Sequence, residues 1–591
     1  MINIFDKLRE FFIKSAREIA IKNGVLLEDS DFSKVVVEPS KDRSHGDFAC
    51  NIAMILSKKF STIKSLDNSK KLAESIKNNT DLEVINKLEI AGPGFINIFI
   101  KDKILFEIIA SIVNEKIYKF KNIGNQEKIN LEYASPNPTG PIHVGHTRGA
   151  IFGDVLANLL KKTGYDVTKE YYINDAGSQI ENLVKSAYIR YLQASGDSIE
   201  IPEGLYPGDY LIEIGKTLFN NFQDSLKDDK NYFDKIRDIV VNEMIKIIVR
   251  DLEDLGIKHD SYFSEKKELH DKNKITEALE ILKKKGLIYV GKLEIPKTAK
   301  GVGANIEGYD DKDQTLFKST LFGDDQDRVV IKADGSPTYF AGDIAYSLSK
   351  FRRGAKKFIM PLGYDHAGYV KRLNAAVMAL TDNKAELKVI LCQMVKFVKN
   401  GQPLKMSKRA NNFITAKDVI DEVGADVLRF MMLTRKNDAP FDFDLQKAVE
   451  QSKDNPIFYV QYAHARCCSV LRNLENENFT PKFSDKITID DLIFLKDEAE
   501  FDLIKKISNF PRIIENSVEN LEPHRIAFYL QDLASSFHSL WNKGSENPDL
   551  KFIISDNSLL TKSRIYLIIA LKIILSTGLE IFNIKPLEKM R

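Results

Sequence analysis

Two histidines in the motif HVGH, His143 and His146, are the residues in this sequence best suited to bind a nucleotide. A proline-rich stretch gives way there to a helical pattern, so both histidines should lie at the start of a helix. Such a start presents unpaired N–H groups and a partial positive charge, which attract anions. Imidazole N–H groups can also bond a triphosphate, and Gly145 lets a planar base approach the backbone. Taken alone, the motif is also typical of unrelated surface histidines or of half a metal site.

Two lysines about 260 residues further along could act on the same phosphates. Lys405 and Lys408 lie in KMSKR, directly after the turn-forming residues 400–403. Two ammonium groups on such a loop can follow negative charge from an α-phosphate to departing pyrophosphate. By itself KMSKR is typical of a solvated basic loop. The two motifs together, in this order and at these junctions between strands, loops and helices, favour nucleotide chemistry.

The elements around HVGH form one strand–helix–strand unit. Residues 128–134 alternate as a strand does, three prolines within 135–141 forbid helix, and residues 167–173 form the next strand. In open parallel sheets ligands bind beyond the carboxyl ends of the strands, where this turn lies. The helix between the strands is indicated by apolar residues at helical spacing: Ala150, Ile151, Val155, Leu159 and Leu160.

The patterns predict three domains. Residues 1–120 form a small α+β domain, and residues 121–450 form a Rossmann-like α/β domain with a parallel sheet and insertions. Residues 451–591 contain four amphipathic patterns and no convincing strand, which predicts an all-α helical bundle. Further strands of the parallel sheet are expected at 357–363 and 387–398, and helical insertions with a connecting segment rich in Gly and charge at about 175–335.

Composition excludes several classes of protein. The chain has 591 residues and a net charge of +2, so RNA affinity must come from local patches. Its 4 cysteines form no CxxC pair, which excludes a disulfide scaffold and favours a reducing, cytoplasmic compartment. The most apolar stretch is cut by Lys572 and Glu580, so it is expected to be a buried helix rather than a membrane span. The spacing of glycines supports neither a P-loop nor a dinucleotide fingerprint.

The sequence resembles the arginyl-tRNA synthetases, a family of class I aminoacyl-tRNA synthetases whose signatures are HIGH and KMSKS. Here valine replaces isoleucine in the first motif and arginine replaces the last serine of the second. The resemblance covers nearly the whole chain. It rests on EYASPNPTGPIHVGHTRGAIFGDVLANLL (132–160), GDFACNIA (46–53), GPGFINI (92–98), YYINDAGSQI (171–180), YPGDY (206–210), GSPTYFAGDIAY (335–346), GYDHAGY (363–369), KMSKRANNF (405–413) and FYVQYAHAR (458–466).

An arginine substrate would need carboxylates, because a guanidinium is always charged and has five planar donors. Glu132 and Asp343 lie at strand ends, and Tyr339 stands one helical turn before Asp343. The alternative for both acids is an ordinary salt bridge. The resemblance implies that Glu132, Asp343 and Tyr339 bind the guanidinium, while Ser135, Asn137 and His146 hold the α-amino and carboxylate end.

The resemblance also implies an ATP site. It assigns His143, Gly145, His146, Gly363, Asp365, His366, Lys408 and the backbone of Val395 to ATP, although Asp365 could instead orient His366. We expect no metal bound by the protein itself, because Mg²⁺ would arrive on the triphosphate. Catalysis would come from positioning and charge stabilisation by His143, His146, Lys405 and Lys408, with no covalent intermediate on the protein.

Transfer RNA would be the second substrate, and the resemblance implies that arginine activation requires it. The N-terminal domain resembles a module for the tRNA elbow, with Phe95 and Asn97 as candidate contacts and a core position favoured for Phe95. The bundle resembles an anticodon-binding domain. Its candidates are Tyr459, Tyr462, His464, Arg466, His538 and Trp541, although a core or structural role is favoured for each of them.

Three other functions compete with this one. A different class I synthetase or a small-molecule adenylyltransferase would share the HxGH turn, and a non-catalytic tRNA-binding paralogue would have lost signature residues that this chain keeps. A zinc hydrolase would normally space its helical histidines by four with a glutamate between them, unlike His143 and His146. The prediction is therefore an arginine–tRNA ligase using ATP with Mg²⁺, L-arginine and tRNA(Arg), cytoplasmic, monomeric and not membrane-bound.

Overall fold

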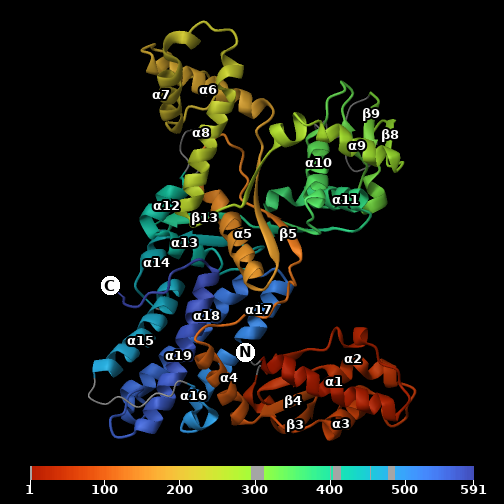
Figure 1. Cartoon of the computed structure of the whole chain (residues 1–591), viewed down its shortest axis with the longest axis vertical. Helices are drawn as coiled ribbons and strands as arrows, with labels where there is room; N and C mark the ends of the chain where they lie inside the picture. The colour runs from red at the N-terminus through yellow and green to blue at the C-terminus, as the bar shows by residue number, and fades with distance from the viewer. Residues whose placement is uncertain are drawn as a thin grey trace.

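The computed structural model describes residues 3–40, 42–293, 312–399, 401–403, 414–452, 454–476 and 486–590. The molecule is elongated (Figure 1). The N-terminal domain and the C-terminal bundle occupy one end, the central sheet lies in the middle, and a helical insertion projects at the other end. Lys405 and Lys408 lie outside the described residues.

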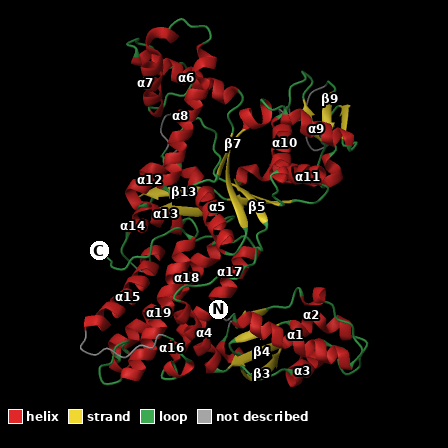
Figure 2. Ribbon diagram, viewed as in Figure 1, coloured by secondary structure: helices red, strands yellow, loops and turns green. Residues whose placement is uncertain are grey.

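The N-terminal domain has the α+β fold that the sequence predicts (Figure 2). Its four antiparallel strands are ordered β1-β2-β4-β3, and helices cover them. Its last helix, α4, packs against α16 and α19 of the C-terminal bundle. The elements are α1 (Ile4–Lys22), β1 (Val37–Pro39), β2 (Phe48–Cys50), α2 (Ile52–Leu56), α3 (Ser69–Asn79), β3 (Ile85–Ala91), β4 (Phe95–Ile100) and α4 (Asp102–Glu115).

A five-stranded parallel sheet forms the centre of the molecule, in the order β12-β11-β5-β6-β7. The predicted strand–helix–strand unit is confirmed, with α5 between β5 and β6. Helix α5 lies on one side of the sheet, and α9, α10 and α11 lie on the other (Figure 1). The elements are β5 (Lys128–Glu132), α5 (Val144–Lys162), β6 (Asp166–Ile173), β7 (Ser261–Ser264), α9 (Lys274–Lys284), α10 (Tyr339–Arg352), β11 (Lys357–Gly363), α11 (Val370–Thr381) and β12 (Glu386–Cys392).

Two insertions interrupt this sheet. The first is helical, as predicted, with α6 (Ser178–Ala194), α7 (Tyr210–Phe222) and α8 (Tyr232–Asp254). The second contains a small antiparallel sheet of order β10-β9-β8, which the sequence did not predict. Its strands are only four residues each, too short for alternation to identify: β8 (Ile288–Gly291), β9 (Gln314–Phe317) and β10 (Arg328–Ile331).

The prediction of one strand over 387–398 was wrong. The chain leaves the central sheet after Cys392, where the backbone of Gln393 is bound by Arg148 and Asn437 at 3.0 and 2.8 Å. It then enters a separate small sheet of order β14-β13-β15. The elements here are β13 (Val395–Lys399), β14 (Gln402–Pro403), α12 (Ala416–Val423), α13 (Ala425–Met431), β15 (Phe441–Asp444) and α14 (Leu445–Val449).

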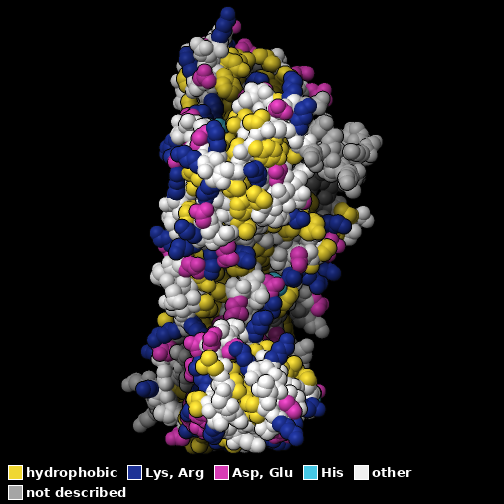
Figure 3. Space-filling model, turned by 90° about the vertical axis from the view of Figure 1, so that its right-hand side faces the viewer, with side chains coloured by type: hydrophobic (Ala, Val, Ile, Leu, Met, Phe, Trp, Pro, Cys, Tyr) yellow, Lys and Arg dark blue, Asp and Glu magenta, His cyan; other side chains and the backbone are white. Residues whose placement is uncertain are grey.

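The C-terminal region is the predicted helical bundle, but its described residues form five α-helices where four patterns were expected. Helix α17 follows α16 after a single residue, and the proline at its start sharpens the break. Across the described residues no helix is both long and apolar enough to cross a membrane. On the face in Figure 3, Lys and Arg are interspersed with Asp and Glu. The helices are α15 (Pro456–Asn476), α16 (Glu498–Ser508), α17 (Phe510–Glu519), α18 (His524–Glu546) and α19 (Ser558–Ile581).

Candidate active site

The HVGH turn caps helix α5 with its own histidines. His143 is the N-cap residue, and its Nδ1 accepts a hydrogen bond from the Gly145 N–H at 3.1 Å. In return the His143 N–H donates to Nδ1 of His146 at 3.4 Å, and the two rings stack with centroids 3.6 Å apart. A Cβ on Gly145 would come within 2.9 Å of the His143 ring. The glycine is therefore needed for this capping geometry.

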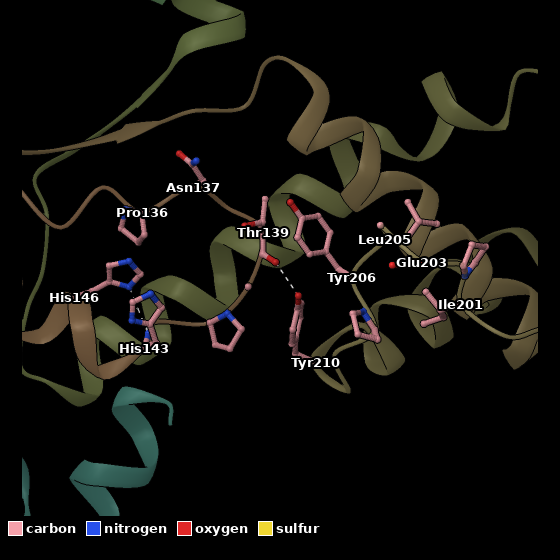
Figure 4. Close-up of a pocket in the computed structure, with 15 residues that line it drawn as sticks. Pro136, Asn137, Thr139, His143, His146, Ile201, Glu203, Leu205, Tyr206 and Tyr210 are labelled. Atoms are coloured by element: carbon pink, nitrogen blue, oxygen red, sulfur yellow. Dashed lines mark hydrogen bonds between the residues drawn. The ribbon is translucent and has the colours of Figure 1, made fainter. Parts of the chain in front are cut away.

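A cleft of about 620 Å³ opens beside these histidines (Figure 4). One wall is the proline-rich loop with Asn137 and Thr139, and the other is residues 201–207 with Tyr210 from the helical insertion. The Tyr210 hydroxyl donates to the Thr139 carbonyl at 2.7 Å and so ties the two walls together. No residue of this second wall was proposed from the sequence. Its only signal was the motif at 206–210.

The chain that follows KMSKR runs beside HVGH. The Ala416 N–H donates to the Ile142 carbonyl at 2.8 Å, and the Val144 N–H donates to the Ile414 carbonyl at 3.2 Å. Thr415 thus forms an antiparallel bridge with His143. The described residues nearest the lysine motif on its C-terminal side therefore contact the histidine motif, although the two are far apart in sequence.

Three carboxylates gather beyond the carboxyl edge of the central sheet, and we call them the acidic slot: Glu132, Asp343 and Glu265. Glu132 ends β5, Asp343 lies in the first turns of α10, and Glu265 follows β7. Burial raises the pKa of Asp343 to about 7, with the negative charges of Glu132 and Glu265 adding to the rise and Lys350 opposing it. Crowded acids of this kind are matched to a cationic ligand. Glu265 was not predicted, because a four-residue strand gave no pattern to mark its end.

Glu132 is already paired with a cation of the protein itself. The Lys350 Nζ lies 2.6 Å from Oε2 of Glu132, and both side chains are almost fully buried. Glu132 therefore does form an ordinary salt bridge, the alternative to substrate binding, through its Oε2 oxygen. Asp343, in contrast, has no ion pair with any residue the structure describes.

Ser135 and Asn137 follow Glu132 on the proline-rich loop, and Tyr339 lies one helical turn before Asp343. The Ser135 hydroxyl oxygen accepts the Tyr172 N–H at 2.9 Å, just after Ala134 adopts a left-handed φ of 52°. Asn137 donates to Gln179 at 2.8 Å, so it is held by the helical insertion. Tyr339 is 73% exposed at the start of α10, where a ligand can reach its ring.

The residues expected to contact adenosine follow β11, the neighbour of β5. Gly363 ends that strand, and a Cβ there would meet only the tip of the exposed Asp365 side chain. Asp365 and His366 are exposed and lie 3.7 Å apart, which fits either a ligand contact or mutual orientation. Val395 begins β13 and is buried.

The candidate RNA contacts differ in how far their side chains are exposed to solvent. Phe95 is 38% exposed, so the core position favoured for it was wrong, whereas Asn97 is buried in the sheet. In the bundle, the Arg466 guanidinium lies over the rings of Tyr462 and Trp541, at 4.1 and 4.6 Å from their centroids.

Two histidines of the bundle have packing roles. His538 bonds the Tyr459 carbonyl at 3.1 Å, and burial together with the nearby Arg466 charge lowers its pKa to about 4 although that carbonyl bond opposes the shift. His464 lies between Ser576 and the Leu587 carbonyl. Both side chains are buried.

A metal site is not found in the described part of the chain. No group of three or more His, Cys, Asp or Glu side chains there is placed to hold an ion. The two HVGH histidines cap a helix instead, and the zinc-hydrolase alternative gains no support from them.

Comparisons with known proteins agree with this geometry. Residues 107–466 match the family model for the class I (R) tRNA synthetase catalytic domain. A parallel sheet with an HxGH turn at its carboxyl edge defines the same class: this is a class I aminoacyl-tRNA synthetase. Residues 6–100 match the arginyl tRNA synthetase N-terminal domain, and residues 460–590 match the DALR anticodon binding domain. The chain belongs to the arginyl-tRNA synthetase family and is a ligase.

Individual relatives support the family over the full length. Proteins named arginine–tRNA ligase from Bartonella henselae and Parvibaculum lavamentivorans are 49% and 46% identical, with 100% of each chain covered. The solved arginyl-tRNA synthetase of Thermus thermophilus superposes with a TM-score of 0.70 over 100% of both chains at 17% identity, which shows the shared fold.

Proposed function

We propose that this enzyme joins L-arginine to tRNA(Arg) for translation in two steps. The arginine carboxylate attacks the α-phosphate of ATP, so that pyrophosphate leaves and arginyl-adenylate forms. The 3′-terminal adenosine hydroxyl of tRNA then attacks the adenylate carbonyl and releases AMP. The observation that carries this proposal is the acidic slot, in which three carboxylates converge next to a helix start suited to phosphates.

In this proposal the guanidinium enters the acidic slot. Asp343 and the oxygen of Glu132 that Lys350 leaves available accept its N–H groups, and Glu265 adds negative charge. Tyr339 packs against the planar group from the start of α10. Ser135, Asn137 and His146 orient the carboxylate toward the α-phosphate, so that the two reacting atoms are held together.

ATP lies between the two signature motifs. His143 and His146 present N–H groups and the start of α5 to the phosphates, while Gly363, Asp365, His366 and the backbone of Val395 hold adenosine. Lys405 and Lys408 stabilise charge on departing pyrophosphate, and Mg²⁺ arrives bound to ATP. The backbone bonds between Ile414–Ala416 and Ile142–Val144 support a common site.

Transfer RNA contacts both terminal domains, which lie at the same end of the molecule. The bundle, from about residue 451, takes the anticodon stem and loop with Tyr462, Arg466 and Trp541, and the domain up to about residue 120 takes the elbow through Phe95. Tyr459 and Asn97 support these surfaces from within. We propose that the enzyme acts as a monomer in the cytoplasm, where translation takes place.

An ATP–pyrophosphate exchange assay with each amino acid, with and without tRNA, tests this function. We expect exchange with arginine alone, and only when tRNA is present. Exchange with lysine or glutamine but not arginine would contradict the specificity. Lys408→Ala should lower the rate of activation with little change in arginine affinity, and an unchanged rate would remove its role.

A further inference from the structure

Helix α10 carries a single polar stripe toward the central sheet. Tyr339, Asp343, Tyr346, Lys350 and Arg353 follow one another at intervals of four and three residues, so they share one face of the helix. Asp343 is at the slot, whereas Tyr346 and Arg353 both bind Glu170 deeper along the sheet. Lys350 lies between these two levels and binds Glu132.

Lys350 is unusual because a charged side chain is buried at this position. It is 2% exposed, and its ammonium lies 2.6 Å from Glu132 and 4.1 Å from the centre of the Tyr346 ring. A buried ion pair contributes little net stability, since apolar side chains of similar size often serve a fold equally well. The stability of the fold therefore does not explain why a lysine is here.

The contact with Lys350 involves one particular oxygen of Glu132. Among the residues that the structure describes, the Glu132 carboxylate accepts one hydrogen bond, from Lys350, and it falls on Oε2. Glu132 is close enough to Asp343 and Tyr172 to perturb both electrostatically. The second oxygen of Glu132 thus remains for a donor that enters the slot.

We propose that Lys350 is a positioning residue of the arginine site, which holds one oxygen of Glu132 and so leaves the other oxygen aimed at the guanidinium. The proposal rests on the function proposed above. It also explains how three acids can share one slot, since an internal ammonium balances one of them before the substrate binds. The other charged or titratable groups around the slot are Asp343, Glu265 with the His270 ring 3.2 Å away, Tyr172 and Arg372. Glu170 and Arg353 lie on the far side of Tyr346.

The test compares Lys350→Met with Lys350→Arg in the full-length enzyme, using arginine-dependent pyrophosphate exchange in the presence of tRNA. Lys350→Met should raise the KM for arginine about 30-fold, because truncating one partner of a buried pair leaves the other charge uncompensated. The KM for ATP and kcat should change by less than about threefold. Lys350→Arg keeps the positive charge and should keep the arginine KM close to that of the unaltered enzyme.

Arg353→Met is the matched control, because it removes a cation from the same helix face that binds Glu170 rather than the slot. It should lower stability and leave the arginine KM unchanged. If Lys350→Met does not fold, the double variant Glu132→Gln/Lys350→Met removes both buried charges and should match Glu132→Gln alone in arginine KM. An added loss in the double variant would overturn the proposal.

Two further outcomes are decisive. An unchanged arginine KM in Lys350→Met, or equal losses for arginine and ATP, would show that Lys350 is only structural. The unaltered enzyme separates this from the function itself: if it activates arginine while Lys350→Met is normal, only the positioning role fails. If it activates a different amino acid, the proposed function fails whatever the variants do.

Discussion

The interface between α10 and the central sheet contains two acidic regions with opposite electrostatics. Glu170, on β6, is fully buried and accepts hydrogen bonds from Asn130, Ser261, Tyr346 and Arg353. Burial opposes its ionisation, but the bonds from Arg353 and the charges of Lys350 and Arg353 outweigh it and lower its pKa to about 2. In the acidic slot, burial and the neighbouring acids instead raise the pKa of Asp343 to about 7.

The difference separates a carboxylate with a structural role, Glu170, from one that we propose binds the substrate, Asp343. Glu170 has donors for both oxygens, so its charge is balanced within the protein. The slot has three carboxylates: Lys350 pairs with Glu132, the His270 ring lies 3.2 Å from Glu265, and Asp343 has no ion pair among the described residues. Because a buried charge is tolerated only when paired, the surplus negative charge indicates where a cationic substrate belongs.

Removing the balanced acid should have the largest effect. Glu170→Gln leaves Arg353 without its partner and should reduce the free energy of unfolding by about 3 kcal/mol, the usual cost of breaking a buried pair. Urea unfolding monitored by circular dichroism measures this loss. The arginine KM of the folded enzyme should stay within about threefold of its normal value. A large rise in that KM with normal stability would reverse the assignment of the two regions.

Removing a carboxylate of the acidic slot should instead weaken arginine binding and leave stability unchanged. Asp343→Asn should raise the arginine KM about 30-fold, equivalent to about 2 kcal/mol for a lost charged hydrogen bond. Stability should not fall, because the carboxylate that is removed is disfavoured by its surroundings. Asp382→Asn, an exposed acid paired with Lys285, is the charge-matched control. If arginine binds normally to Asp343→Asn, the guanidinium is held elsewhere.

The pH dependence of arginine binding should show a smaller effect. Asp343 must be ionised to pair with the guanidinium, so below its pKa of about 7 the affinity for arginine should fall up to about tenfold per pH unit. Arginine binding near pH 7 should therefore release a proton, which calorimetry in buffers of different ionisation enthalpy detects. Asp343→Asn should abolish the release. Proton uptake, or a flat KM between pH 6 and 8, would contradict the assignment.

The same group has a predictable influence on stability. Its folded pKa of about 7 exceeds the ordinary value of 3.8, so between these limits the native state holds the proton more tightly. The contribution of Asp343 to stability therefore decreases as pH rises through that window. For Glu170 the sign is reversed: its contribution is present above its ordinary value of 4.5 and is lost as pH falls toward about 2.

Patterns that are local in sequence predicted much of the fold. The strand at β5, the proline-rich loop and the capped helix α5 follow from alternation, proline and helical spacing within 35 residues. The strands β7 to β10 escaped prediction because each has four residues. The end of β12 was missed because Gln393 and Met394 do not interrupt the apolar pattern, and only contacts with Arg148 and Asn437 divert the chain.

The sequence by itself determined the nucleotide motifs, the helical bundle and the resemblance to one synthetase family, because each depends on residues that are close neighbours in the chain. Only the tertiary structure decided the composition of the acidic slot. Glu132 and Lys350 stand 218 residues apart, and Glu265 comes from a third segment between them. Parallel strands align their carboxyl ends at one edge, and α10 packs across them, so charges that no sequence pattern relates are brought within bonding distance.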